Sequence, residues 1–135
     1  MRKEHFLLLV VFLLLTVCTT TVHGLNVSLE RTLSHDSDVN AVAFNHDGTI
    51  LATATDADNY SVKLWDVQSG QLIRTLTGHT SYIWDIEFDP TGAVIATASG
   101  DNSIKIWTTS TGQLASTFEG HSSTVFTLAF NPDGS

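Results

Sequence analysis

Histidine and aspartate are the residues of this sequence whose spacing could support metal binding or acid–base chemistry. His35, Asp36, Asp38 and His46 would be candidate metal ligands, but three of them lie in one loop and their spacing matches no zinc pattern. The Asp-Ala-Asp-Asn segment at 56–59 suggests a calcium loop, yet it lacks the central glycine and distal glutamate of a helix-loop-helix site. Nucleophile motifs, glycine-rich phosphate loops and recognisable pairs of catalytic carboxylates are also missing. We therefore predict a non-enzymatic protein with no catalytic residue, no metal and no cofactor.

The charge balance argues against nucleic acid as a partner. The 135 residues include 6 Lys and Arg against 14 Asp and Glu, a formal net charge of −8. Neutralising phosphates needs clustered basic side chains, which this composition does not offer. The single cysteine, Cys18, lies close to the N-terminus, so residues 25–135 contain neither a disulfide nor a thiolate.

Residues 1–24 have the layout of a secretory signal peptide. Two basic residues precede an uncharged run at 6–22, and a polar segment follows. This pattern predicts a secreted or extracytoplasmic protein, with a membrane-anchored protein facing outside as the alternative if the segment is not cleaved. Only in that second case would the protein contact a membrane. In a eukaryotic host, Asn26 and Asn59 would be candidate glycosylation sites, because each begins an Asn-x-Ser triplet.

An internal repeat is the strongest signal in the rest of the chain. Residues 72–92 match residues 114–134 at an offset of 42, and an earlier copy spans 29–48 at an offset of 44. Such a period is typical of architectures built by repeating one small structural unit. His79 and His121 recur beside a glycine at the same place in the period, which favours a structural role over a catalytic one. His46 does not recur and is expected to be an exposed turn residue.

Short segments of strand-like pattern fill each period, separated by Asp-Gly, Thr-Gly or Ser-Gly turn dipeptides. We expect four short strands in each full period and an all-β fold, since no part of residues 25–135 shows sustained helical periodicity. The expected strands lie at 39–44, 50–55, 61–65, 72–76, 83–88, 94–99, 103–107, 114–118 and 125–130.

The order of these motifs resembles that of the WD-repeat family. Gly-His, a Pro-Asp-Gly-type turn, an Asp-Asn turn and a terminal Trp recur in sequence between residues 29 and 135. Trp65 is followed by the aspartate that gives the family its name, whereas Trp107 is followed by threonine, and the first copy lacks the glycine before its histidine. The resemblance implies a β-propeller, in which each four-stranded antiparallel sheet forms one blade. The expected domain at 25–135 would contain repeats at about 29–71, 72–113 and 114–135.

The resemblance also implies a buried tetrad of His, Ser or Thr, Asp and Trp in each blade. Carried over position by position, the tetrads are His79, Ser99, Asp101 and Trp107 in the second repeat and His35, Thr55, Asp58 and Trp65 in the first. A two-residue insertion makes Asp56 a rival of Asp58. A closed network of this kind would be structural, because buried polar groups are costly unless they are paired.

Partner contacts in such propellers usually come from the rim where the chain enters each innermost strand. The candidate partner-binding residues at this rim are Tyr82, Trp84, Asn40 and Phe126. Tyr82 and Trp84 are the strongest, since aromatic residues often anchor interfaces, although Trp84 could instead pack against the neighbouring blade. The leading interpretation is a scaffold for protein–protein interaction in an exported protein. The alternatives are the propeller of a larger exported enzyme and a propeller that binds carbohydrate or another small ligand.

The strand count falls short of a closed ring. Residues 39–76 and 83–118 would form two complete blades, and 29–33 and 125–130 would be single strands of two more. Propellers typically close with 4 to 8 blades. We therefore expect the C-terminus to be a truncation of a longer protein. If the chain is this short, several copies could assemble a ring.

Overall fold

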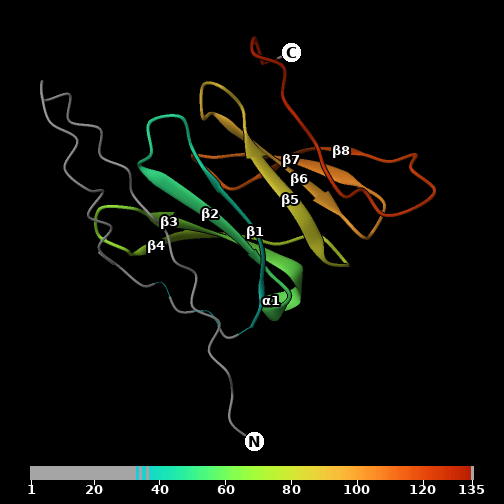
Figure 1. Ribbon diagram of the computed structural model, residues 1–135, viewed down its shortest axis with the longest axis horizontal. Coiled ribbons are helices and arrows are strands. Elements are labelled where there is room, and N and C mark those ends of the chain that lie inside the picture. The colour runs from blue at the N-terminus through green and yellow to red at the C-terminus, as the bar shows by residue number, and fades with distance from the viewer. Residues whose placement is uncertain (1–32, 34, 36, 135) are drawn as a thin grey trace, which may run out of the picture.

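Two four-stranded antiparallel sheets dominate the part of the chain that the structure describes (Figure 1). The computed structural model describes residues 33, 35 and 37–134, except for the side chains at 57 and 58. The predicted signal peptide at 1–24, most of the expected strand at 29–33 and the side chain of Asp58 lie outside the described residues. Among the residues that are described, no helix is long and apolar enough to cross a membrane.

Within each sheet, the strands follow the order of the chain, and each strand pairs with the next one of that sheet. The first sheet, blade 1, consists of β1 (Val39–Phe44), β2 (Ile50–Thr55), β3 (Ser61–Asp66) and β4 (Leu72–Leu76). The second sheet, blade 2, consists of β5 (Ile83–Phe88), β6 (Val94–Ser99), β7 (Ile104–Thr108) and β8 (Leu114–Phe118). These strands confirm the predicted all-β class and the four-stranded antiparallel blades.

The blades also repeat their irregularities. The pairing of β1 with β2 shifts between Val39 and Ala41, and that of β5 with β6 shifts between Ile83 and Asp85. A β-bulge places one extra residue in a strand and can redirect its side chain. The extra residues here are Asn40 and Trp84, which occupy the same position in two successive repeats.

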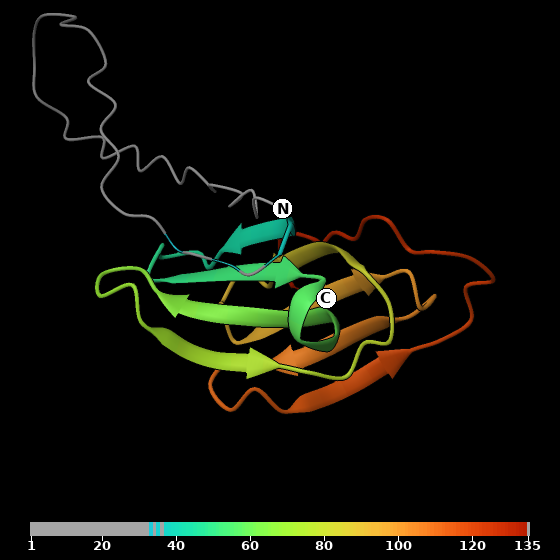
Figure 2. The same cartoon turned by 90° about the horizontal axis from the view of Figure 1, so that it is seen from below.

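One apolar core joins the two blades. Strand β1 lies against β5 at the interface, and Figure 2 shows the two sheets packed face to face. Leu64 and Leu76 of blade 1 and Ile83 and Ile95 of blade 2 belong to one buried cluster and are at most 1% exposed. Blade 2 covers Leu76 in this way, whereas the equivalent Phe118 is 58% exposed on the outer face of blade 2.

Two segments differ from the sequence-based expectation. Residues 57–60 form a short helix, α1 (Ala57–Tyr60), although no helix was expected between residues 25 and 135. Its last residues, Asn59 and Tyr60, have positive φ angles of 58° and 55°, a left-handed conformation that reverses the chain direction within the two-residue insertion.

The segment 125–130, expected as a single strand of an incomplete blade, forms no ladder with the described residues. The segment is instead held against blade 2 by single hydrogen bonds. The backbone N–H groups of Leu128 and Phe130 donate to carboxylates of β5, at 3.0 Å to Asp85 Oδ2 and 2.7 Å to Glu87 Oε2.

Candidate functional site

A buried hydrogen-bond network connects the strands of blade 2. His79 Nδ1 lies 2.7 Å from Asp101 Oδ2, and His79 Nε2 lies 2.7 Å from Thr97 Oγ1. The indole N–H of Trp107 donates to the same Thr97 oxygen at 2.9 Å. A neutral imidazole satisfies this geometry when Nδ1–H donates to the carboxylate and Nε2 accepts from the hydroxyl.

At neutral pH, the shifted pKa values of His79 and Asp101 leave the imidazole neutral and the carboxylate ionised. Burial lowers the pKa of His79 below its usual 6.5, and it outweighs the opposite effect of the Asp101 carboxylate. Burial alone would raise the pKa of Asp101, but hydrogen bonds from Ser103, His79 and the backbone of Thr80 lower it to about 2. Both charge states match the hydrogen bonds that the network makes.

The hydroxyl in this network belongs to Thr97, not to the predicted Ser99. Trp107 pairs with Ile95 across the sheet, so its indole reaches Thr97, two residues along on the same face. Ser99 lies two residues further on, where its hydroxyl donates to the carbonyl of Ser81 at 3.2 Å. The recurring Ala-Thr-Ala triplet of β2 and β6 was the signal that could have identified the correct threonine.

The described side chains of blade 1 show two contacts of the equivalent arrangement. The indole N–H of Trp65 donates to Thr53 Oγ1 at 2.9 Å, so Thr53 replaces the predicted Thr55 for the same reason of register. The His35 ring packs edge-on against Trp65, with ring centroids 5.4 Å apart. Asp56 lies just before α1, and its Oδ1 is buried without a hydrogen-bond partner.

The glycine before His79 has a packing role. A Cβ atom added at Gly78 would lie 3.2 Å from the Trp107 ring, and the glycine has a φ of 152°. Gly120, the equivalent residue one repeat later, has nothing within 4 Å of such an atom. The Gly-His motif therefore lets the tryptophan of the network pack directly on the backbone.

An exposed row of aromatic rings lies at the rim of the two blades. Ring centroids are 5.3 Å apart between Tyr60 and Tyr82, 5.8 Å between Tyr82 and Trp84, and 5.8 Å between Trp84 and Phe126. Tyr82, Trp84 and Phe126 are 43%, 40% and 66% exposed. We call these four residues the aromatic row.

The aromatic row unites three of the four predicted partner-binding residues and adds one that the sequence did not reveal. Tyr60 belongs to the row because the insertion in blade 1 folds into α1. The insertion was the one feature of the sequence that could have pointed to Tyr60. Asn40 occupies the same bulge position as Trp84 but is only partly exposed, and its Nδ2 is buried without a hydrogen-bond partner.

Backbone contacts hold the central rings of the row. The N–H of Gly100 donates to the carbonyl of Tyr82 at 2.8 Å. A Cβ atom at Gly100 would lie 2.8 Å from Ser81 Oγ and 3.4 Å from Trp84 Nε1, so a larger residue would displace this segment. The turn after β6 thus positions Tyr82 and Trp84.

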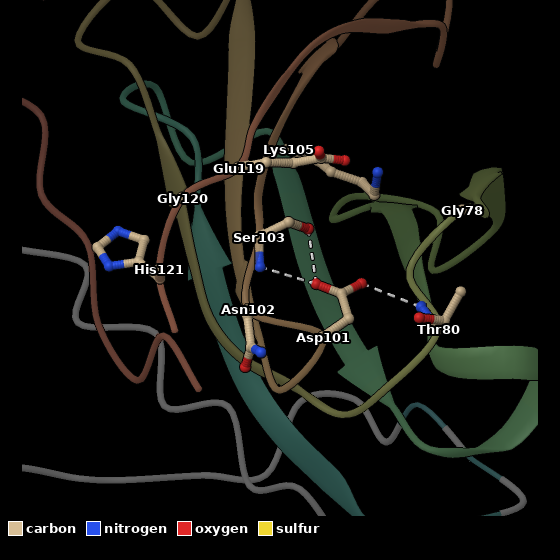
Figure 3. A pocket seen from close by; sticks show the side chains of 9 residues that line it. All are labelled: Gly78, Thr80, Asp101, Asn102, Ser103, Lys105, Glu119, Gly120 and His121. Atoms are coloured by element: carbon tan, nitrogen blue, oxygen red, sulfur yellow. Dashed lines mark hydrogen bonds between the residues drawn. The ribbon is translucent and has the colours of Figure 1, made fainter. Parts of the chain in front are cut away.

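A polar pocket of about 400 Å³ opens beside blade 2 (Figure 3). Its lining residues are Gly78, Thr80, Asp101, Asn102, Ser103, Lys105, Glu119, Gly120 and His121. The Asp101 carboxylate in its wall is already bonded to Ser103 and Thr80, as Figure 3 shows. Within the part of the chain that the structure describes, no three His, Cys, Asp or Glu residues cluster as metal ligands would.

Sequence comparison relates most of the chain to one family of repeats. The family model described as "WD domain, G-beta repeat" matches residues 27–66, 70–108 and 112–135. A nuclear distribution protein PAC1 of Tuber melanosporum is 38% identical over 55 residues, which cover 41% of this chain and 12% of that protein. Lissencephaly-1 homologs of Monosiga brevicollis and Caenorhabditis briggsae are 38% and 36% identical over 58 and 63 residues. These stretches cover 43% and 47% of this chain but 14% and 16% of the two relatives.

The relatives overturn the expected location. The names of these proteins refer to nuclear distribution or to Lissencephaly-1, and neither describes an exported protein. The prediction of a secreted or extracytoplasmic protein, with an outward-facing membrane anchor as its alternative, is therefore wrong. The repeats, by contrast, agree in period, motif order and fold with the matched model, so the chain belongs to the WD-repeat family.

Proposed function

We propose that the chain is a non-enzymatic WD-repeat scaffold that binds a protein partner through the aromatic row. The observation that carries this proposal is the contact of four rings from separate loops and strands in one exposed line. Rigid aromatic side chains supply large contact areas at low entropic cost, and they are enriched among the residues that dominate binding energy.

The support beneath the row favours a preformed binding surface. The N–H of Gly100 bonds to the backbone carbonyl of Tyr82, and the Trp84 indole lies close to Gly100, so the turn supports the segment that carries both rings. A surface that is ordered in advance avoids part of the entropy loss on binding.

The chain's acid–base residues favour a scaffold over an enzyme. His79 is 4% exposed, and both its ring nitrogens bond to side chains of blade 2. The carboxylate of Asp101 receives hydrogen bonds from its own turn. These groups hold strands together, and the Asp101 carboxylate in the wall of the polar pocket is already engaged by Ser103 and Thr80.

Selection from a random peptide library tests the proposal. The full 135-residue chain, immobilised, should enrich peptides whose binding falls at least tenfold with Trp84→Ala. Leu72→Ala is the matched control, because Leu72 is 48% exposed on the outer strand β4 and its truncation removes a similar apolar surface elsewhere. Enriched peptides that bind both variants like the wild type would refute the proposal.

A second variant tests the role of the supporting turn. Gly100→Ala should weaken the same peptides by displacing Ser81 and Trp84, without altering any side chain of the row. Near-ultraviolet circular dichroism would verify that each variant remains folded. Unchanged affinity for Gly100→Ala would show that the preformed support does not matter.

A further inference from the structure

We propose that the partner segment is cationic, a stretch of protein whose arginine or lysine side chain lies over the aromatic row. This inference rests on the proposed function and adds the chemistry of the partner at the same surface. It follows from the distribution of charge around the row.

Basic side chains are confined to the outer halves of the blades. Among residues 37–134, the only lysines and arginines are Lys63 on β3, Arg74 on β4 and Lys105 on β7. Arg74 donates to the carbonyls of Ser110 and Thr111 at 2.7 and 3.0 Å, which ties blade 1 to blade 2. The inner strands β1, β2, β5 and β6 carry neither lysine nor arginine.

Acidic residues occur beside residues of the aromatic row in the sequence, or at an equivalent position of the repeat, on both blades. Asp38 is exposed just before β1, at the position that Tyr82 holds before β5. Asp56 immediately precedes α1, which carries Tyr60. Asp85 follows Trp84, and its Oδ2 accepts hydrogen bonds from Thr127 and Leu128, next to Phe126.

Together these features select a cation over other ligands. The faces of aromatic rings attract ammonium and guanidinium groups, and tryptophan does so best. The flanking carboxylates lie within a chain of net charge −8, which would speed the approach of a basic segment and repel an acidic one. A neutral apolar segment could stack on the rings but would gain nothing from the carboxylates.

The library selection separates this inference from the proposed function. Enrichment of arginine- or lysine-containing peptides that depend on Trp84 would support both. Enrichment of Trp84-dependent peptides that are neutral or acidic would overturn the cationic partner and leave the scaffold function standing. A selection with no Trp84-dependent peptide would overturn the scaffold function and the inference with it.

A direct titration tests the cation itself. The probe is the capped peptide Gly-Arg-Gly-Arg-Gly, compared with the same peptide carrying citrulline, which keeps the shape but not the charge. We expect a saturable shift of the Trp84 indole N–H resonance with the arginine peptide and at least fivefold weaker binding of the citrulline peptide. Equal binding of the two peptides, or no binding of either, would overturn the inference.

Charge variants assign the contribution of the flanking carboxylates. Asp38→Asn should weaken the arginine peptide two- to fivefold and reduce the salt dependence of its binding. Asp47→Asn is the matched control, since it removes the same charge from the turn at the opposite end of β1. Equal effects of the two variants would show that the net charge, and not the acidic flank, attracts the peptide, which would overturn this part of the inference.

Discussion

The two blades share one backbone plan but differ in how they hold their polar core. In blade 2, Thr97 bonds to both His79 and Trp107, and the Asp101 carboxylate completes the chain of contacts. In blade 1, Trp65 reaches Thr53, and His35 packs on the Trp65 ring. Trp107 is 2% exposed, whereas Trp65 is only partly buried.

The loop between the second and third strands also differs between the blades. Blade 2 turns from Ser99 to Ser103 through three residues, and Asp101 faces His79. Blade 1 has five residues between Thr55 and Ser61, and the last four of them form α1. The same insertion brings Tyr60 to the aromatic row, so blade 1 contributes an additional residue to the proposed binding surface.

Removing the central hydroxyl of each blade should give the largest contrast. Thr97→Val leaves two buried groups without a partner, the imidazole Nε2 and the indole N–H, and should cost roughly 2–4 kcal/mol of stability. Thr53→Val affects the partly buried indole of Trp65 and should cost about 1 kcal/mol. Urea denaturation monitored by circular dichroism measures both losses. Equal losses would mean that the blades do not differ energetically.

Acid should destabilise blade 2 through two groups, His79 and Asp101, because the pKa of each is lowered in the folded chain. The lowered pKa of His79 means that its protonation favours the unfolded chain, so stability falls as the pH drops below about 6.5. The lowered pKa of Asp101, about 2 against the usual 3.8, adds a second loss between roughly pH 4 and pH 2. Asp101→Asn should be less stable at pH 7 but should lose less stability than the wild type below pH 4. Thermal denaturation across this range measures the two curves, and parallel curves would contradict the assignment.

Grafting the turn of blade 2 into blade 1 tests the contribution of the insertion to the aromatic row. Replacing residues 56–60 with Gly-Asp-Asn reproduces the spacing that brings Asp101 to His79. Because the graft removes Tyr60, it should weaken peptide binding at the aromatic row. Isothermal titration with an enriched peptide measures the change. Unchanged affinity would show that the insertion does not contribute to the binding surface.

The smallest expected contrast concerns the Gly-His motif. Gly78→Ala and Gly120→Ala both place alanine at a positive φ, but only Gly78 lies against a tryptophan ring. The additional crowding against Trp107 should make Gly78→Ala more destabilising by about 1 kcal/mol. Parallel urea titrations of the two variants measure this difference.

Much of the fold followed from the repeat, but the details of the sites did not. The period correctly placed all eight strands of the two blades to within about one residue, because alternating patterns and turn dipeptides mark strands locally. The hydroxyl of the network was misassigned, since Thr97 and Ser99 lie on the same face of β6 and only the pairing of Trp107 with Ile95 selects between them. Tyr60 was missed because the insertion folds into a left-handed turn that no period describes.

The sequence by itself determined the repeated unit, its strand order and the residue types that recur in each blade. These depend on local alternation and on turn residues, which act over a few positions along the chain. Only the tertiary structure decided which side chains meet, namely Thr97 with Trp107 and Tyr60 with Tyr82. Such contacts depend on strand register, bulges and the packing of one blade against the next, and a shift of a single residue would exchange the partners.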